Sequence, residues 1–206
     1  MSKNMRFRRK EWLSVLLCTV ATAVGVTLAS PFIFMVIFTV GMAGGFENAS
    51  TYIELLTKAG LILGTIIGFG QKLTLIGQAS RLNWWIRASI LGGTLGGLIV
   101  GSLGETAVIL SVAMPGIAIG IAQQFVLMKF LKKATVWGWI PVNIIAWIVA
   151  QVLFIVSYVV FLSTGFVPIF QLNPVPTLFA LLFSGAIPGL ITGIYLTRLL
   201  RNFKKE

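Results

Sequence analysis

Residues 64–71 read GTIIGFGQ and residues 116–123 read GIAIGIAQ, so a GxxxGxxQ pattern occurs twice, and 52 residues separate the two starts. Both copies lie in strongly apolar segments. Glycines four positions apart lie on one face of a helix, where the missing side chains let a neighbouring backbone approach closely in lipid. The pattern therefore predicts membrane helices that pack tightly against one another.

The match continues beyond the glutamines, because Leu75 aligns with Leu127 and Trp85 aligns with Trp137. A weaker third copy, GAIPGLIT, ends at Thr192, where threonine replaces glutamine. In the predicted topology each copy crosses the membrane in the same direction. We therefore expect three parallel two-helix repeats, related by an axis along the membrane normal.

Composition identifies lipid as the solvent of these helices. Apolar residues make up 57% of the 206 positions, charged residues make up 10%, and the mean hydropathy is +0.98. Water-soluble domains do not reach such values. Because a membrane helix needs about 20 residues, we predict an all-α, six-helix bundle that forms a single transmembrane domain over residues 1–206. The expected helices span about residues 12–41, 61–78, 84–103, 106–128, 137–162 and 176–200.

Two segments depart from uniform apolar helix. Pro31 predicts a kink in the first helix, because proline removes one backbone hydrogen bond. The longest polar connection is expected at residues 44–58, before the second helix. Within it, Glu54 and Lys58 are spaced for an ion pair on a surface helix.

The distribution of charge predicts the orientation of the chain. There are 16 Lys and Arg residues against 5 Asp and Glu residues. Of the basic residues, only Lys58 falls on the side away from the amino terminus, whereas Glu47, Glu54 and Glu105 fall there. Cytoplasmic loops are rich in Lys and Arg, so both termini are expected in the cytoplasm, in a bacterial cytoplasmic or internal, thylakoid-like membrane. The basic residues thus indicate topology and attraction to anionic lipid headgroups, not binding of nucleic acid.

Tryptophans mark the starts of the first, third and fifth expected helices. Indole side chains are enriched at the headgroup level of a bilayer. We therefore expect this set to anchor the helices at the membrane surface. The set consists of Trp12, Trp84, Trp85, Trp137 and Trp139.

Glycines at helical spacing are the candidate packing residues. Close helix packing is favoured over a substrate pathway, because helices in lipid associate largely through small residues. The candidates are Gly60, Gly64, Gly68, Gly92, Gly96, Gly116, Gly120, Gly185, Gly189 and Gly193.

Five polar residues inside the expected spans are candidate ligand-binding residues, since an unpaired amide there costs about 2–7 kcal/mol. They are Gln71, Gln123, Asn143, Gln151 and Thr192. At a rise of roughly 1.5 Å per residue, Gln123 and Asn143 share one depth and are expected to pair. Gln71 is expected near Ser89, and with Thr192 these residues could form a polar ring. Such a ring could bind a ligand, but hydrogen bonding between helices is favoured.

The sequence argues against metal and enzyme chemistry. Histidine is absent, which removes the commonest general base and metal ligand. The single cysteine, Cys18, allows neither a disulfide framework nor a Cys-based metal site within one chain. No nucleophile and base stand at a recognisable spacing. We therefore expect no cofactor, no metal site and no enzymatic activity.

The GxxxGxxQ unit, followed by leucine, a basic loop and tryptophan, resembles a group of uncharacterised small multispanning membrane proteins, many of them cyanobacterial. The resemblance covers about residues 60–145. Those proteins typically carry tryptophan after the glutamine and arginine after the leucine. Here Lys72 or Gln124 and Ile76 or Met128 stand at those places. The resemblance implies a membrane fold and brings no activity with it.

Three functions are compatible with these features. The favoured one is a non-enzymatic accessory, assembly or scaffold subunit of a larger membrane complex, with other membrane subunits as partners. The alternative is a small-solute carrier or the substrate-binding membrane subunit of an uptake transporter, since the vitamin-binding subunits of energy-coupling-factor transporters share this size and topology. The third is pigment or lipid binding, in which Gln71, Gln123 or Asn143 would ligate a magnesium porphyrin.

Overall fold

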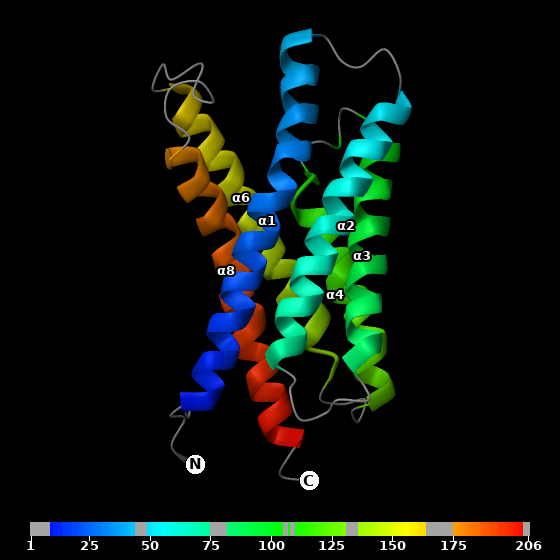
Figure 1. Ribbon diagram of the computed structural model, residues 1–206, viewed down its shortest axis with the longest axis vertical. Coiled ribbons are helices and arrows are strands. Elements are labelled where there is room, and N and C mark those ends of the chain that lie inside the picture. The colour runs from blue at the N-terminus through cyan, green and yellow to red at the C-terminus, as the bar shows by residue number, and fades with distance from the viewer. Residues whose placement is uncertain are drawn as a thin grey trace.

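The computed structural model describes residues 9–43, 49–74, 82–104, 107, 110–130, 136–163 and 175–203. Within these ranges the chain is all-α, as predicted, and is dominated by six long helices. They are α1 (Arg9–Ala43), α2 (Ala49–Thr74), α3 (Leu82–Ser102), α4 (Ala113–Phe130), α6 (Trp139–Ser163) and α8 (Val175–Phe203). Figure 1 shows that α1 begins and α8 ends at the same end of the bundle, which we call the terminal end.

Four of these helices are long and apolar enough to cross a membrane, so the chain is a membrane protein. α3 and α4 do not meet the same criterion in the described residues. In α3, glycines and Arg87 lower the mean hydropathy. Crossing by these two helices stays a prediction. The four candidate spans are Glu11–Ile33, Ser50–Leu73, Trp139–Val156 and Leu181–Arg201.

The helices follow one another around the bundle in chain order. Each packs against the next, from α1 to α2, α3, α4, α6 and α8, and α8 packs back against α1. A smaller contact joins α2 to α4. The two helices nearest the chain ends therefore close the bundle.

α1 contains Pro31 and continues past it to Ala43. Proline leaves the carbonyl four residues earlier without its helical donor, and here that carbonyl belongs to Thr27. The Oγ of Ser30 donates to the Thr27 oxygen at 2.7 Å. This side-chain bond replaces the missing backbone bond, which explains why the helix continues through the proline.

α2 begins at Ala49, earlier than the predicted start at Leu61. Of the residues that suggested a connection, Ser50, Glu54 and Lys58 are exposed and Lys58 pairs with Glu54 as expected, whereas residues 44–48 lie outside the described part of the chain. On the inner face, Tyr52 and Leu56 are buried. Because these two residues are one helical turn apart and pack into the core, the segment forms part of the long helix instead of a loop.

α4 begins at Ala113, later than the predicted start at Thr106. After α3, Gly104 adopts a φ of 74°, a left-handed conformation that favours glycine and commonly ends helices. Because α4 starts late, its first backbone N–H groups lie inside the protein and have no partner in their own helix. A side chain of α6 accepts hydrogen bonds from them.

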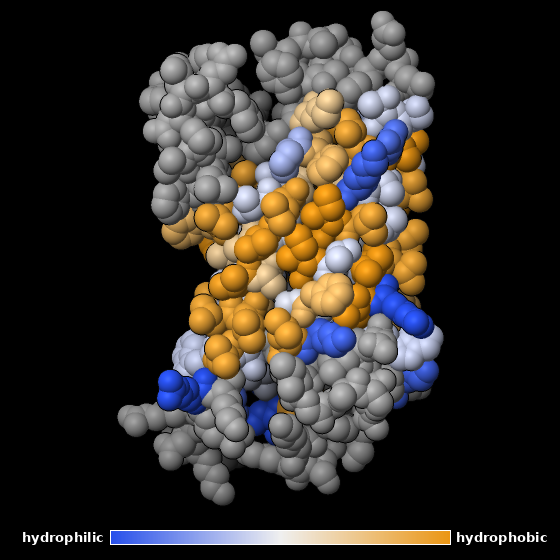
Figure 2. All heavy atoms as spheres, viewed as in Figure 1, coloured by the Kyte–Doolittle hydropathy of each residue, from blue (hydrophilic) through white to orange (hydrophobic). Residues whose placement is uncertain are grey.

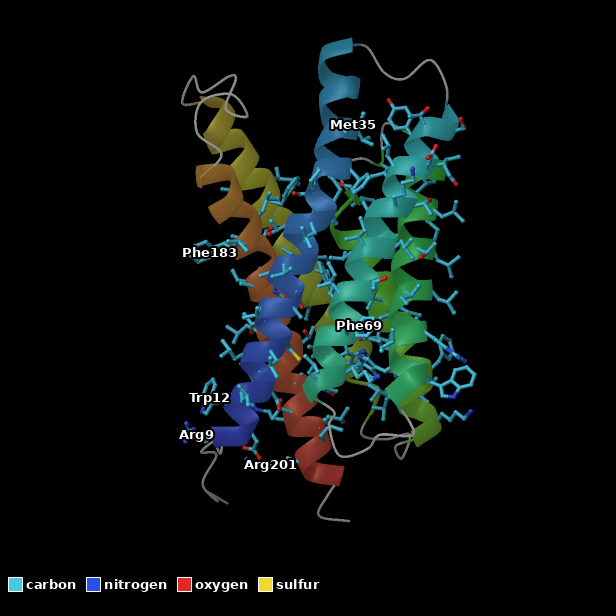
Figure 3. All side chains as sticks on the ribbon, viewed as in Figure 1. Arg9, Trp12, Met35, Phe69, Phe183 and Arg201 are labelled. Atoms are coloured by element: carbon cyan, nitrogen blue, oxygen red, sulfur yellow. The ribbon has the colours of Figure 1, made fainter. Side chains whose placement is uncertain are left out.

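The surface has the pattern expected in lipid. Figure 2 shows apolar side chains over the middle of the visible face, with hydrophilic residues toward the two ends. In Figure 3, Phe69 and Phe183 lie in this middle zone, and Arg9, Trp12 and Arg201 lie at the terminal end. There Arg201 of α8 pairs with Glu11 of α1 at 3.7 Å, which adds a polar link where the two helices meet.

Candidate functional site

All ten candidate packing glycines are buried where helices of this chain meet. A Cβ at any of them would lie under 3.0 Å from an atom of another helix. On Gly60 it would lie 2.0 Å from the oxygen of Gly93, and on Gly64 it would lie 2.2 Å from the oxygen of Ser89. The other contacts join Gly68 to Ser89, Gly92 to Ala118, Gly96 to Pro115, Gly116 to Trp147, Gly120 to Asn143, and Gly185, Gly189 and Gly193 to α1.

Gln71 and Gln123 meet inside the bundle. The Nε2 of Gln123 donates to the Oε1 of Gln71 at 2.6 Å and to the Oγ of Ser89 at 2.9 Å. The indole Nε1 of Trp85 donates to the same oxygen of Gln71 at 3.1 Å. The Oγ of Ser89 in turn donates to the Trp85 carbonyl at 2.9 Å. One buried network therefore joins α2, α3 and α4.

The expected pair of Gln123 with Asn143 is wrong. Asn143 packs against Gly120, one turn along α4 from Gln123, and its Nδ2 donates to the carbonyl of Trp139 in its own helix at 3.0 Å. Thr192 likewise donates to the carbonyl of Pro188 in its own helix at 2.7 Å. The polar ring is therefore reduced to the two glutamines and Ser89.

Four buried polar atoms on three residues of α4 and α6 have no hydrogen-bond partner in the protein. They are the Oε1 of Gln123, both amide atoms of Gln124 and the Nε1 of Trp139. Gln123 is 0% exposed, Gln124 1% and Trp139 0%, so bulk solvent does not reach them. We call Gln71, Trp85, Ser89, Gln123, Gln124 and Trp139 the glutamine cluster.

Aromatic rings surround the glutamine cluster. The ring centroid of Trp139 lies 6.0 Å from that of Trp85, edge to face, and 6.1 Å from that of Tyr195 in α8. Buried Leu127, Val136, Leu196 and Leu199 pack around these rings. The cluster thus lies in an apolar setting, where each hydrogen bond is strengthened and each unpaired polar group is costly.

Trp85 and Trp139 were expected to anchor the helices at the membrane surface, but both face the interior of the bundle. They are 2% and 0% exposed, whereas the nearby Trp84 and Trp137 are 51% and 61% exposed. The carbonyls of Trp85 and Trp139 each accept a hydrogen bond from the polar side chain four positions later, Ser89 and Asn143.

Gln151 has a structural role in the middle of α6. Its Oε1 accepts hydrogen bonds from the backbone N–H groups of Val112 and Ala113, both at 3.0 Å. The first N–H groups of a helix lack partners within it. Gln151 therefore caps α4 from a neighbouring helix, which is why a glutamine can be buried there.

These contacts can be set beside known proteins. No family model, curated protein or solved structure matches this chain. The resemblance to small multispanning proteins therefore stays a prediction, and the chemistry follows from the residues themselves.

The chemistry available to the glutamine cluster is hydrogen bonding without charge. Its polar groups are amides, indoles and one hydroxyl, which donate and accept but do not serve as general acids or bases near neutral pH. The described residues contain no group of three His, Cys, Asp or Glu side chains able to hold a metal. The arrangement is suited to holding a neutral polar molecule.

The sequence pattern did not single out Gln124, because the repeated motif ends at its neighbour Gln123. It aligns with Lys72, so the two copies share no chemistry at that position. An available signal was its place inside an apolar helix beside Gln123. Two consecutive amides in a membrane helix cannot both face lipid without cost.

Proposed function

We propose that this chain is a non-enzymatic membrane protein that binds a small, uncharged, hydrogen-bonding molecule in the glutamine cluster. Such a role fits a small-solute carrier or the substrate-binding subunit of an uptake transporter. The observation that carries the proposal is the group of unpaired polar atoms on Gln123, Gln124 and Trp139.

The energetic argument is direct. A buried polar group without a partner costs about 1–3 kcal/mol, and Gln123, Gln124 and Trp139 carry four such atoms. A molecule with both a donor and an acceptor would pair with the amide of Gln124. Ordered water could meet the same atoms, so the experiment must separate a solute from water.

The chemistry of the surroundings selects a neutral molecule. Among the described residues, the buried set contains no Asp, Glu, Lys or Arg. An ion would enter this apolar setting without a counter-charge, at a cost far above that of a neutral group. Hydroxyl, amide and neutral heteroaromatic compounds are therefore the expected class.

The favoured sequence-based function, an accessory subunit, relied on glycine faces suited to partner helices. All ten of those glycines face other helices of the same chain. Their packing is explained without a second protein. We therefore place ligand binding first and make a protein partner an outcome of the test.

We also propose a membrane topology and an internal repeat for the chain. We place six crossings in the membrane, with the basic terminal end in the cytoplasm. A repeat of two-helix units is supported by three equivalent bonds, each from a polar side chain to the carbonyl four residues earlier, and each polar residue faces a glycine of a neighbouring helix. The pairs are Thr22 with Cys18 in α1, Ser89 with Trp85 in α3, and Asn143 with Trp139 in α6.

The test compares the small molecules that co-purify with three forms of the full chain. The site variant is the double substitution Gln124→Leu, Trp139→Phe. The matched control is Phe125→Leu, Trp137→Phe, at outward-facing neighbours that are 65% and 61% exposed. We expect a neutral compound, detected by mass spectrometry after denaturation, with the wild type and the control but not with the site variant.

Folding of the site variant is checked independently by thermal unfolding. Removing the unpaired polar atoms offsets part of the packing lost on Trp139→Phe, so we expect the site variant to keep a cooperative transition and to lose no more than about 2 kcal/mol. Equal small-molecule content in all three forms, or none in the wild type, would reject the proposal. A stoichiometric protein partner bound equally by all three forms, with no solute, would favour the accessory role.

A further inference from the structure

Trp84 of α3 lies beside two basic side chains at the surface of the bundle. The Cζ of Arg87 lies 5.5 Å from its ring centroid, and the Nζ of Lys129 lies 5.1 Å from it. Arg87 belongs to α3 and Lys129 to α4, so the three side chains span two adjacent helices. Trp84 is 51% exposed, and both basic residues are exposed.

The two cations are thus held near each other at the membrane surface. Each is attracted to the ring, but they repel one another, and at exposed positions a cation–π contact is weak. An anion placed beside the ring would offset this repulsion. The indole between them is the side chain that prefers the headgroup level.

An exposed apolar strip runs from these cations toward the middle of the bundle. On α3, Leu91 and Leu95 follow Arg87 at intervals of four residues, and they are 60% and 52% exposed. On α4, Phe125 and Ile121 precede Lys129 at the same interval, and they are 65% and 41% exposed. Residues four apart lie on one helix face, so each cation stands at the end of an apolar row.

The two rows are adjacent because α3 and α4 pack closely. A Cβ on Gly92 would lie 2.6 Å from the oxygen of Ala118, and on Gly96 it would lie 2.5 Å from the Cα of Pro115. The result is one continuous surface with two positive charges at its terminal end and apolar side chains below them.

We propose that Trp84, Arg87 and Lys129 bind the phosphate of an anionic phospholipid, whose acyl chains lie along α3 and α4. The two cations complement a negatively charged headgroup, and the apolar rows extend to a depth that only a lipid chain or another helix reaches. A soluble anion would use the cations but not the rows. This site is separate from the glutamine cluster and does not depend on the function proposed for it.

The experiment measures lipid binding to the detergent-purified full chain by native mass spectrometry. Long-chain phosphatidylglycerol is compared with phosphatidylcholine, with short-chain phosphatidylglycerol and with inorganic phosphate. The site variant is Arg87→Gln, Lys129→Gln. The matched control, Arg9→Gln, Lys72→Gln, removes the same charge from other basic residues of α1 and α2.

We expect long-chain phosphatidylglycerol to bind the wild type and the control variant, and to bind the site variant at least ~10-fold more weakly, since each basic residue near an anionic lipid contributes appreciably to binding. Binding of phosphatidylcholine should be weaker and insensitive to either substitution.

Three results would overturn the proposal. Equal losses in the two double variants would show general attraction to the basic end. Equal binding of short-chain lipid or inorganic phosphate would show a soluble-anion site without a role for the apolar rows. Equal binding of the two long-chain lipids would show no headgroup recognition. Thermal unfolding of both variants checks that a loss does not come from misfolding.

Discussion

The α2–α3 and α4–α6 pairs both begin with a helix that carries GxxxGxxQ, yet they close in different ways. In α2, Gly64 of the motif and Gly60 one turn before it meet the backbone of α3 at Ser89 and Gly93, and Gly68 meets the small side chain of Ser89. In α4, Gly116 instead receives the indole ring of Trp147, and Gly120 receives the side chain of Asn143. The motif therefore provides a helix face without side chains. The sequence of the neighbouring helix determines whether backbone or a large side chain packs there.

This difference determines what each contact can tolerate. Two backbones cannot move apart at one residue without separating the helices over several turns. A side chain that fills a glycine socket can be shortened or rotated. Substitutions at the two kinds of glycine contact should therefore differ in cost and in whether a second substitution can restore the fold.

The largest effect is expected at the backbone contact. Gly60→Ala would place a Cβ 2.0 Å from the oxygen of Gly93, so the α2–α3 pair must separate, and we expect a loss of about 3 kcal/mol or more. Unfolding in detergent, followed by circular dichroism, measures it.

The matched control is the same substitution at Gly25 of α1, where a Cβ would lie 3.4 Å from the Cδ1 of Leu63, an ordinary contact. Gly25→Ala should change stability by no more than about 0.5 kcal/mol. Similar losses in the two variants would mean that close backbone contact is not what makes Gly60 necessary.

A smaller effect, which a second substitution can reverse, is expected at Gly116, where a side chain packs against the glycine. Gly116→Ala would place a Cβ 2.0 Å from the ring of Trp147, and we expect a loss of about 2 kcal/mol. In the background Trp147→Leu, which removes the ring, the same substitution should cost little. A double-mutant cycle measures this coupling, and simple additivity of the two losses would contradict the distinction between the pairs.

The smallest effect tests whether α6 also holds α4 at its start. Gln151→Met keeps the size of the side chain but removes the acceptor for the N–H groups of Val112 and Ala113. We expect a loss of about 1 kcal/mol, typical of a removed helix cap. Val152→Leu, at an exposed neighbour, is the control. Unchanged stability after Gln151→Met would mean that the cap contributes nothing.

The sequence predicted what depends on periodicity. Spacing and composition identified an all-α membrane protein and the glycines that lie between helices. They also placed both glutamines inside the protein, since an amide in lipid needs a partner. The start of α2 was predicted too late, because the charges of Glu54 and Lys58 suggested a loop. The burial of Tyr52 and Leu56, which extends the helix, is apparent only in the folded structure.

The partners of the buried groups could not be predicted in the same way. Depth along a helix placed Gln123 level with Asn143, but the rotation of each helix about its axis decides which side chains meet. That rotation comes from packing over the whole bundle. It turns Trp85 and Trp139 inward while Trp84 and Trp137 face outward, and it directs Gln123 to Gln71.

The contact between α1 and α8 has a consequence for biosynthesis. α1 is synthesised before α8, so it meets α2 early, but its face that receives Gly185, Gly189 and Gly193 stays uncovered until α8 is made. Thr22 and Cys18 lie on that face. A nascent protein stalled before α8 is expected to stay an open, chaperone-dependent intermediate, and insertion of α8 is expected to complete the packing around α1.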